Sequence, residues 1–190
     1  MLKRIFKISL VMILSLSMLG CSKDDEQQSS PINDNQSTSQ NTTSAFGEDF
    51  TTSHIPDITI QFGNEGRPFT MHFENNDTAL TIARNIGEDG RNLPIYDYDN
   101  FENYEVMQYY DIPSSYNIPA SAQTINQQKA GEVYYMAPNR VVLFYQDANI
   151  PGEYTKIGTI EEAEELKLAI ENNPVQEGWG NKLVLIRFAE

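Results

Sequence analysis

Hydrophobic and polar residues alternate along two short segments that a turn separates. Ile58, Ile60 and Phe62 alternate with polar residues, and Phe69, Met71 and Phe73 do so after the turn Asn64-Glu65-Gly66. A period of two is typical of a strand with one buried face. The glycine-containing turn joins the two segments, so the pattern predicts a β-hairpin.

Two segments change to a period near 3.6, which predicts amphipathic helices. In the first, Ala79, Ile82, Ala83 and Ile86 share a face, Asn76 or Asp77 can cap the start, and Gly87 follows the end. In the second, Thr159 and Glu162 have the spacing of a capping box, Ala163, Leu166 and Ile170 face inward, and Asn173-Pro174 stops the helix.

The other elements are short and apolar, and are expected to be strands. They are Ile95–Tyr98, Tyr104–Tyr110, Val133–Met136, Val141–Tyr145, Tyr154–Ile160 and Leu183–Phe188. Residues 111–129 contain two prolines and many small polar residues, so they are expected to form a long loop. Many short strands with two isolated helices predict a mainly β fold, a closed barrel with a helix over each end.

The N-terminal segment has the pattern of an export signal. Lys3, Arg4 and Lys7 precede an apolar run, Ile8–Met18, that is too short to span a bilayer. Leu19-Gly20-Cys21 then resembles a bacterial lipobox, in which the cysteine is acylated. We therefore expect residues 1–20 to be a signal peptide and Cys21 to be the lipidation site. The predicted location is the cell envelope, on the extracytoplasmic side of a membrane reached through acyl chains on Cys21.

Composition limits the remaining functions. Residues 22–54 are rich in Ser, Thr, Gln, Asn and Asp, so residues 21–54 are expected to be an acylated, disordered tether and residues 55–190 the domain. The net charge is −14, and removal of the signal would take away three further cations, which argues against nucleic acid as a partner. Cys21 is the single cysteine, so no intramolecular disulfide can form.

Several residue strings resemble the bacterial cyclophilin-like domain family. The stretch Ile58–Ile86 is similar to the opening of a cyclophilin, and Ala130–Pro138 resembles its Gly-to-Met-Ala strand. Val142–Tyr145 and Ile157–Ile160 match the next two core strings, although Glu132 stands where the family usually has Asp. The resemblance covers roughly residues 55–190 and implies a cyclophilin-like barrel.

A cyclophilin isomerises X-Pro bonds with an arginine beside an apolar pocket. The corresponding segment here, residues 104–110, contains no arginine, and Arg91 is the nearest cation that could replace it. The resemblance places Met136, Ala137 and Phe144 in the ligand pocket, with Tyr104 and Tyr109 as aromatic walls. The alternative is that these residues simply fill the barrel.

No other catalytic or cofactor site is expected. His54 and His72 are the two histidines, too few for a typical metal site, and residues 97–100 are better explained as a polar turn than as a calcium loop. The predicted function is therefore a non-catalytic module that binds a peptide or small ligand. The alternative is a prolyl isomerase with a relocated catalytic residue, and a structural envelope subunit is a third reading.

Replacing Cys21 tests the lipid anchor. In Cys21→Ala, the acylation site is lost, so the protein should leave the membrane fraction or accumulate as an uncleaved precursor. Fractionation and mass spectrometry of the N-terminus measure both results. Normal processing with normal membrane retention would contradict the predicted lipidation.

Overall fold

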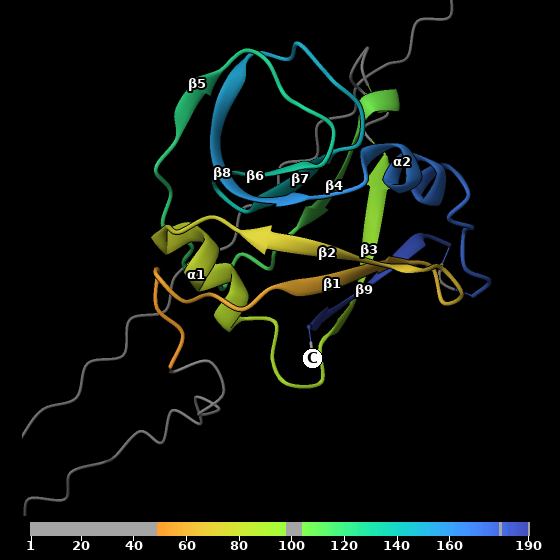
Figure 1. Cartoon of the computed structure of the whole chain (residues 1–190), viewed down its shortest axis with the longest axis horizontal. Helices are drawn as coiled ribbons and strands as arrows, with labels where there is room; N and C mark the ends of the chain where they lie inside the picture. The colour runs from red at the N-terminus through yellow and green to blue at the C-terminus, as the bar shows by residue number, and fades with distance from the viewer. Residues whose placement is uncertain (1–48, 98–103, 179, 190) are drawn as a thin grey trace, which may run out of the picture. The chain divides into compact units, whose positions relative to one another are not determined.

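The computed structural model describes residues 49–97, 104–178 and 180–189, which form a β-barrel with two helices (Figure 1). Cys21, the predicted signal peptide and most of the predicted tether lie outside these residues. The strands are β1 (Ile58–Phe62), β2 (Pro68–Phe73), β3 (Arg91–Asp97), β4 (Met107–Asp111), β5 (Gln123–Ile125), β6 (Glu132–Met136), β7 (Arg140–Phe144), β8 (Gly152–Ile160) and β9 (Lys182–Phe188). The 3-10 helix η1 (Tyr104–Val106) precedes β4.

Eight of these strands close on themselves in an antiparallel barrel. The sheet order is β2-β1-β9-β3-β4-β7-β6-β8, and β2 pairs with β8 to complete the ring, with Met71 opposite Ile160. Strand β5 pairs only with β8, on the outside of the ring. The predicted hairpin is the β1–β2 pair, with Ile58 opposite Met71. The predicted mainly β barrel is confirmed.

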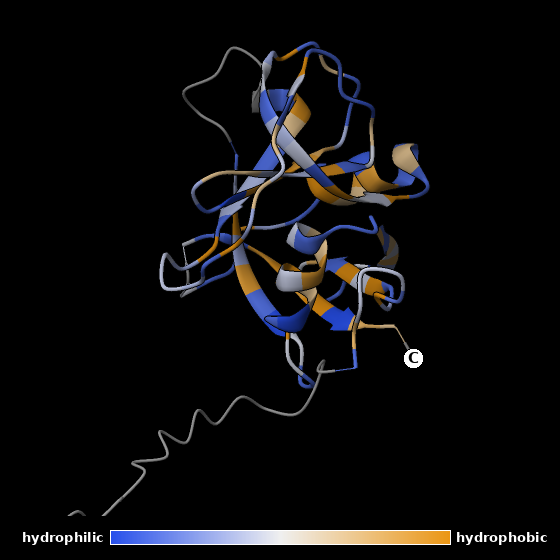
Figure 2. Cartoon of the chain, turned by 90° about the vertical axis from the view of Figure 1, so that its left-hand side faces the viewer, coloured by the Kyte–Doolittle hydropathy of each residue, from blue (hydrophilic) through white to orange (hydrophobic). Residues whose placement is uncertain are grey.

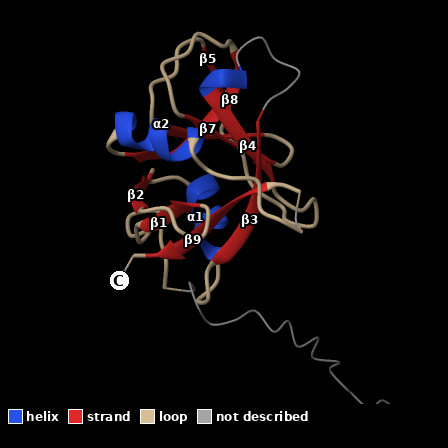
Figure 3. Ribbon diagram, turned by 90° about the vertical axis from the view of Figure 1, so that its right-hand side faces the viewer, coloured by secondary structure: helices blue, strands red, loops and turns tan. Residues whose placement is uncertain are grey.

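The two helices follow strands at different ends of the barrel (Figures 1 and 3). Helix α1 (Asp77–Arg84) begins where Asn76 accepts a hydrogen bond from the Ala79 N–H through its side-chain oxygen, at 2.9 Å. Helix α2 (Ala163–Glu171) buries Leu166 and Ile170. Each helix covers apolar side chains that an uncovered barrel end would expose to water.

The predicted capping box before α2 is wrong. Thr159 belongs to β8, where it pairs with His72 of β2 and with Glu132 of β6. The residue before the helix is instead Glu162, in a left-handed conformation with φ of 61° and no side-chain cap. Its carboxylate accepts a hydrogen bond from Arg67 at 2.6 Å. Barrel closure thus outweighs the local capping pattern.

Two other local predictions differ from the structure. The first three residues of the expected strand 104–110 form η1, so only Met107 onward joins the sheet. The expected loop 111–129 contains the short strand β5, whose pairing with Tyr154 and its neighbours could not be recognised from three mostly exposed residues.

Hydrophobic residues recur along the strands of the barrel wall (Figure 2), and their side chains form two clusters on its two faces. The larger cluster fills the interior with residues from β1, β2, β6, β7, β8 and β9 and from both helices. A smaller cluster, which we call the outer cluster, lies on the other face of β4, β6, β7 and β8. Its buried members are Met107, Tyr134, Val142, Phe144, Ala148, Ile150 and Tyr154.

The described chain begins with a segment that contacts the barrel. The Phe50 ring packs edge-on against Phe188 at a centroid distance of 5.2 Å, and Arg84 donates a hydrogen bond to the Phe50 carbonyl. The domain boundary at residue 55 stays a prediction. Neither helix in the described ranges is long and apolar enough to cross a bilayer.

Gly131 tests how tightly β6 is tied to β8. Its φ is +90°, and a Cβ there would lie 2.2 Å from the Ile160 carbonyl oxygen. Gly131→Ala should therefore lower the free energy of unfolding by about 3 kcal/mol, through backbone strain and a forced shift of β8. Chemical denaturation measures this loss.

Gly87 provides the matched control. Its φ is +82°, but a Cβ there would meet no atom within 4 Å. Gly87→Ala should cost only the left-handed conformation, about 1 kcal/mol. Equal losses in the two variants would mean that the contact with Ile160 does not constrain the barrel.

Candidate functional site in the barrel interior

A cavity of about 170 Å³ lies inside the barrel, among the inward-facing side chains. Its walls are mainly aliphatic and come from strands all around the ring. Among them are Ile58, Met71, Leu93, Val133, Ile157 and Val184. The alternation of each strand explains this composition, because inward positions are apolar whereas their neighbours face solvent or the outer cluster. The interior can therefore surround an apolar molecule.

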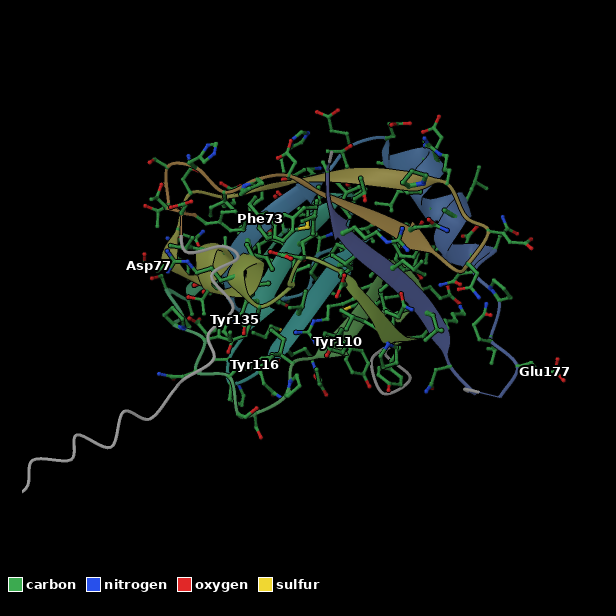
Figure 4. The ribbon with its side chains drawn as sticks, turned by 90° about the horizontal axis from the view of Figure 1, so that it is seen from below. Phe73, Asp77, Tyr110, Tyr116, Tyr135 and Glu177 are labelled. Carbon is green, nitrogen blue, oxygen red and sulfur yellow. The ribbon has the colours of Figure 1, made fainter. Side chains whose placement is uncertain are left out.

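Helix α1 and the segment after β4 line one end of the cavity, which we call the mouth. Ile82, Asn85 and Ile86 come from the end of α1 and the residues after it, and Tyr110 and Tyr116 come from β4 and the following segment. Figure 4 labels both tyrosines. Most of the polar side chains that line the cavity are at this end.

Arg91 is the cation at the mouth. It is the first residue of β3, and its Nε donates to the Ile86 carbonyl at 3.0 Å while one terminal nitrogen donates to the Asn85 carbonyl at 3.1 Å. These carbonyls follow α1, so the positive charge also suits the negative end of the helix dipole. The two bonds orient the guanidinium toward the mouth and leave its other terminal nitrogen without a hydrogen-bond partner among the described residues.

Two phenol groups stand near that guanidinium. Burial raises the pKa of Tyr110 above its ordinary value, Tyr116 adds to the rise, and the charge of Arg91 opposes it. Tyr110 is thus a neutral phenol at physiological pH and can donate a hydrogen bond. Neither tyrosine hydroxyl has a hydrogen-bond partner in the part of the chain that the structure describes.

Gln108 is the polar residue deeper in the cavity wall, and its side chain is fully buried. Its Nε2 donates to Asp97 Oδ1 at 2.6 Å, and Lys182 holds the other Asp97 oxygen at 3.2 Å. A carboxylate can only accept, so the amide must present its nitrogen to Asp97. Gln108 Oε1 is left without a partner among the described residues. An orphaned acceptor costs about 1–3 kcal/mol.

A second buried acceptor has no described partner, but it lies elsewhere. Asn173 Oδ1 is 3.0 Å from where a Cβ on Gly63 would be, and its amide nitrogen donates to the Leu183 carbonyl at 3.0 Å. Asn173 does not line the cavity. Gln108 is therefore the orphaned acceptor that a molecule in the cavity could satisfy.

The residues expected to form the ligand pocket do not lie together around one cavity. Phe144 belongs to the outer cluster and has an exposed fraction of 0%, and Met136 and Tyr109 pack against that cluster. Ala137 is exposed in the turn after β6. Tyr104 starts η1, and its side chain lies outside the described part of the structure. Of the four whose side chains the structure describes, only Tyr109 also lines the interior cavity.

Arg140 lies beside the outer cluster. It begins β7, and its guanidinium stacks over the Tyr109 ring at 4.2 Å from the centroid. Asp111 accepts two hydrogen bonds from the same guanidinium, at 2.5 and 2.8 Å. The group is thus positioned by an aromatic ring and a carboxylate together.

Glu132, the residue that departs from the resembled motif, ties two strands together. Its carboxylate accepts hydrogen bonds from the Lys129 N–H at 2.7 Å, the Tyr134 hydroxyl at 2.7 Å and Lys156 Nζ at 2.9 Å. Burial raises the pKa of Glu132, but these hydrogen bonds outweigh it and the pKa is lowered. This set of contacts stabilises the fold and leaves no open ligand position on the carboxylate.

Comparison with known proteins agrees with the barrel fold. The model of the cyclophilin-like family matches residues 60–179, more than half of the chain. The chain belongs to the cyclophilin-like family. This cyclophilin-like chain also resembles a solved structure of McbB in complex with tryptophan, with a TM-score of 0.51 and 15% sequence identity.

The McbB match covers 69% of this cyclophilin-like chain and 44% of McbB, so the chain spans less than half of that protein. At this identity the likeness shows the fold alone. No curated protein sequence matches the chain.

Gln108 was not among the residues predicted for the site, although the sequence pattern contains a signal for it. Gln108 is polar and has the same strand phase as Tyr110 and Ile112, so it breaks the apolar alternation.

Proposed function

We propose that this protein is a lipid-anchored binding module of the cell envelope whose small ligand occupies the barrel interior. The observation that carries this proposal is the cavity of about 170 Å³ among aliphatic side chains. We place the binding site in the barrel interior and not on the outer face, because Phe144, which was expected to line the pocket, is fully buried there. The predicted anchor, Cys21, and the polar segment after it would hold the domain near a membrane.

The energetic argument starts from the cost of empty space. Side chains that line unfilled space lose the dispersion contacts that a packed core would give them. Apolar cavities of about 150 Å³ stay dry and bind a molecule such as benzene. A ligand of one ring with short substituents would restore some of the lost contacts. Eight-stranded barrels are of the size that can hold one small ligand.

The isomerase alternative depends on an arginine beside the outer cluster. Arg140 is that arginine, and it replaces Arg91 as the candidate because Arg91 lines the interior cavity. Its guanidinium is already bound to Asp111 through two hydrogen bonds. A donor held in this way gains little by turning to a prolyl nitrogen, so the observation favours binding over catalysis.

Blocking the cavity tests the binding function. Residues 22–190 should bind toluene, indole or tryptophan, the last chosen because McbB is solved with it. Val141 lines the cavity, so Val141→Phe should weaken binding at least tenfold by occupying the space. Methyl NMR of labelled isoleucines measures binding, with shifts expected at interior residues such as Ile157.

The control for this experiment is Val175→Phe. Val175 is 61% exposed, so the same substitution there should leave affinity unchanged. Ile82→Phe at the mouth is a second blocking variant if Val141→Phe does not fold. If none of the probes binds, or if blocking has no effect, the interior is not the binding site.

Prolyl isomerisation in a short peptide tests the alternative. An apolar surface without a free donor binds ground and transition states alike, so residues 22–190 should show less than about 1% of the rate of a cyclophilin control. Faster isomerisation that Arg140→Ala or Arg91→Ala abolishes would establish an enzyme and identify its donor. Faster isomerisation that survives both changes would place the donor elsewhere.

A further inference from the structure

We propose that the ligand of the interior cavity is a small aromatic carboxylate with a hydrogen-bond donor at the end of the ring opposite the acid. This inference rests on the proposed binding function and specifies its ligand. It follows from the polar groups that line the mouth and the deeper wall of an otherwise apolar cavity.

The mouth presents donors that suit an anion. Arg91 has one terminal nitrogen that bonds to no described residue, and its positive charge reaches Tyr110. The hydroxyls of Tyr110 and Tyr116 have no described partner and lie near one another. Guanidinium and phenol donors together match the oxygens of a carboxylate. A neutral apolar molecule would give no partner to the two hydroxyls or to the remaining terminal nitrogen of Arg91.

The deeper wall presents the opposite polarity. Gln108 is 0% exposed, lines the cavity and keeps Oε1 without a described partner, because Asp97 binds the amide nitrogen. A second carboxylate placed here would meet an acceptor and the Asp97 charge behind it. A hydroxyl or N–H of the ligand would instead satisfy Gln108 Oε1.

The volume and the aliphatic walls of the cavity determine what kind of group the ligand has between the mouth and the deeper wall. A cavity of about 170 Å³ with aliphatic walls fits one aromatic ring and its substituents. On β4, Gln108 and Tyr110 are two residues apart and share the inward face, so they are about 7 Å apart along the strand. A ring with an acid at one end and a donor at the other fits between such groups.

Three compounds that differ by one group each test the inference. They are 4-hydroxyphenylacetate, phenylacetate, which lacks the donor, and 4-hydroxyphenylacetamide, which lacks the charge. With residues 22–190, titration calorimetry should show the first binding at least tenfold more tightly than the amide and several-fold more tightly than phenylacetate.

Each advantage should disappear in one variant only. Arg91→Gln should bring the ratio of acid to amide close to one, and Gln108→Met should remove the gain from the ring hydroxyl while preserving the acid's advantage. Because each ratio is measured within one variant, a general loss of affinity or stability cancels. Arg187→Gln, an exposed arginine outside the cavity, should keep both ratios.

If Arg91→Gln does not fold, the double variant Tyr110→Phe with Tyr116→Phe tests the same end, with Tyr154→Phe in the outer cluster as its control.

Ratios unchanged by the cavity variants would overturn the inference. So would binding of toluene without any preference for the acid, although the proposed function would then stand. Failure of toluene as well as the three compounds would overturn the proposed function itself.

Discussion

The pairing of β2 with β8 is the constraint on which the rest of the structure depends. It joins the two ends of the eight-strand order, so that no strand of the ring keeps a free edge. The approach is close enough that only glycine fits at position 158, where a Cβ would lie 2.6 Å from the His72 carbonyl oxygen. Once the ring closes, every inward side chain shares one volume, and the helices at its ends determine how that volume meets solvent.

Closure also divides the aromatic residues into two sets, because Phe62, Phe69 and Tyr135 pack in the interior whereas another set packs outside. Tyr134, Phe144 and Tyr154 pack against one another on the outer face, with ring centroids 5.3 to 6.1 Å apart. The inward positions of β6 and β7 hold Val133, Val141 and Leu143, which line the cavity, and also Tyr135, which packs in the interior without lining it. A side chain can serve only one face of a strand, so none of the three outer rings occupies the barrel interior, where the cavity lies.

The fold was largely predictable, whereas the site was not. Strict alternation at Ile58, Ile60 and Phe62 predicted β1 with its observed bounds, because the polarity of each side chain indicates which face of the strand it occupies. The capping box wrongly predicted at Thr159 shows where local signals fail, since pairing with His72, distant in sequence, decides the conformation. The cavity depends on how side chains from all around the ring pack together, and no single segment of the sequence determines that packing. Arg140 could not be placed over Tyr109 for the same reason: the pairing of β4 with β7 sets that contact.

The acidic composition sets how an anionic ligand would be recognised. A net charge of −14 repels anions at long range, so the field of the protein would slow their approach. At physiological ionic strength this repulsion is largely screened beyond about 8 Å, whereas donors at the mouth act at contact distance. Arg91 is held by carbonyls rather than by a carboxylate, so its charge is not cancelled by an ion pair with any described acid. Arg140, in contrast, is neutralised by Asp111. Selectivity for a carboxylate would therefore come from the mouth of the barrel and would persist at salt concentrations that remove the influence of the acidic surface.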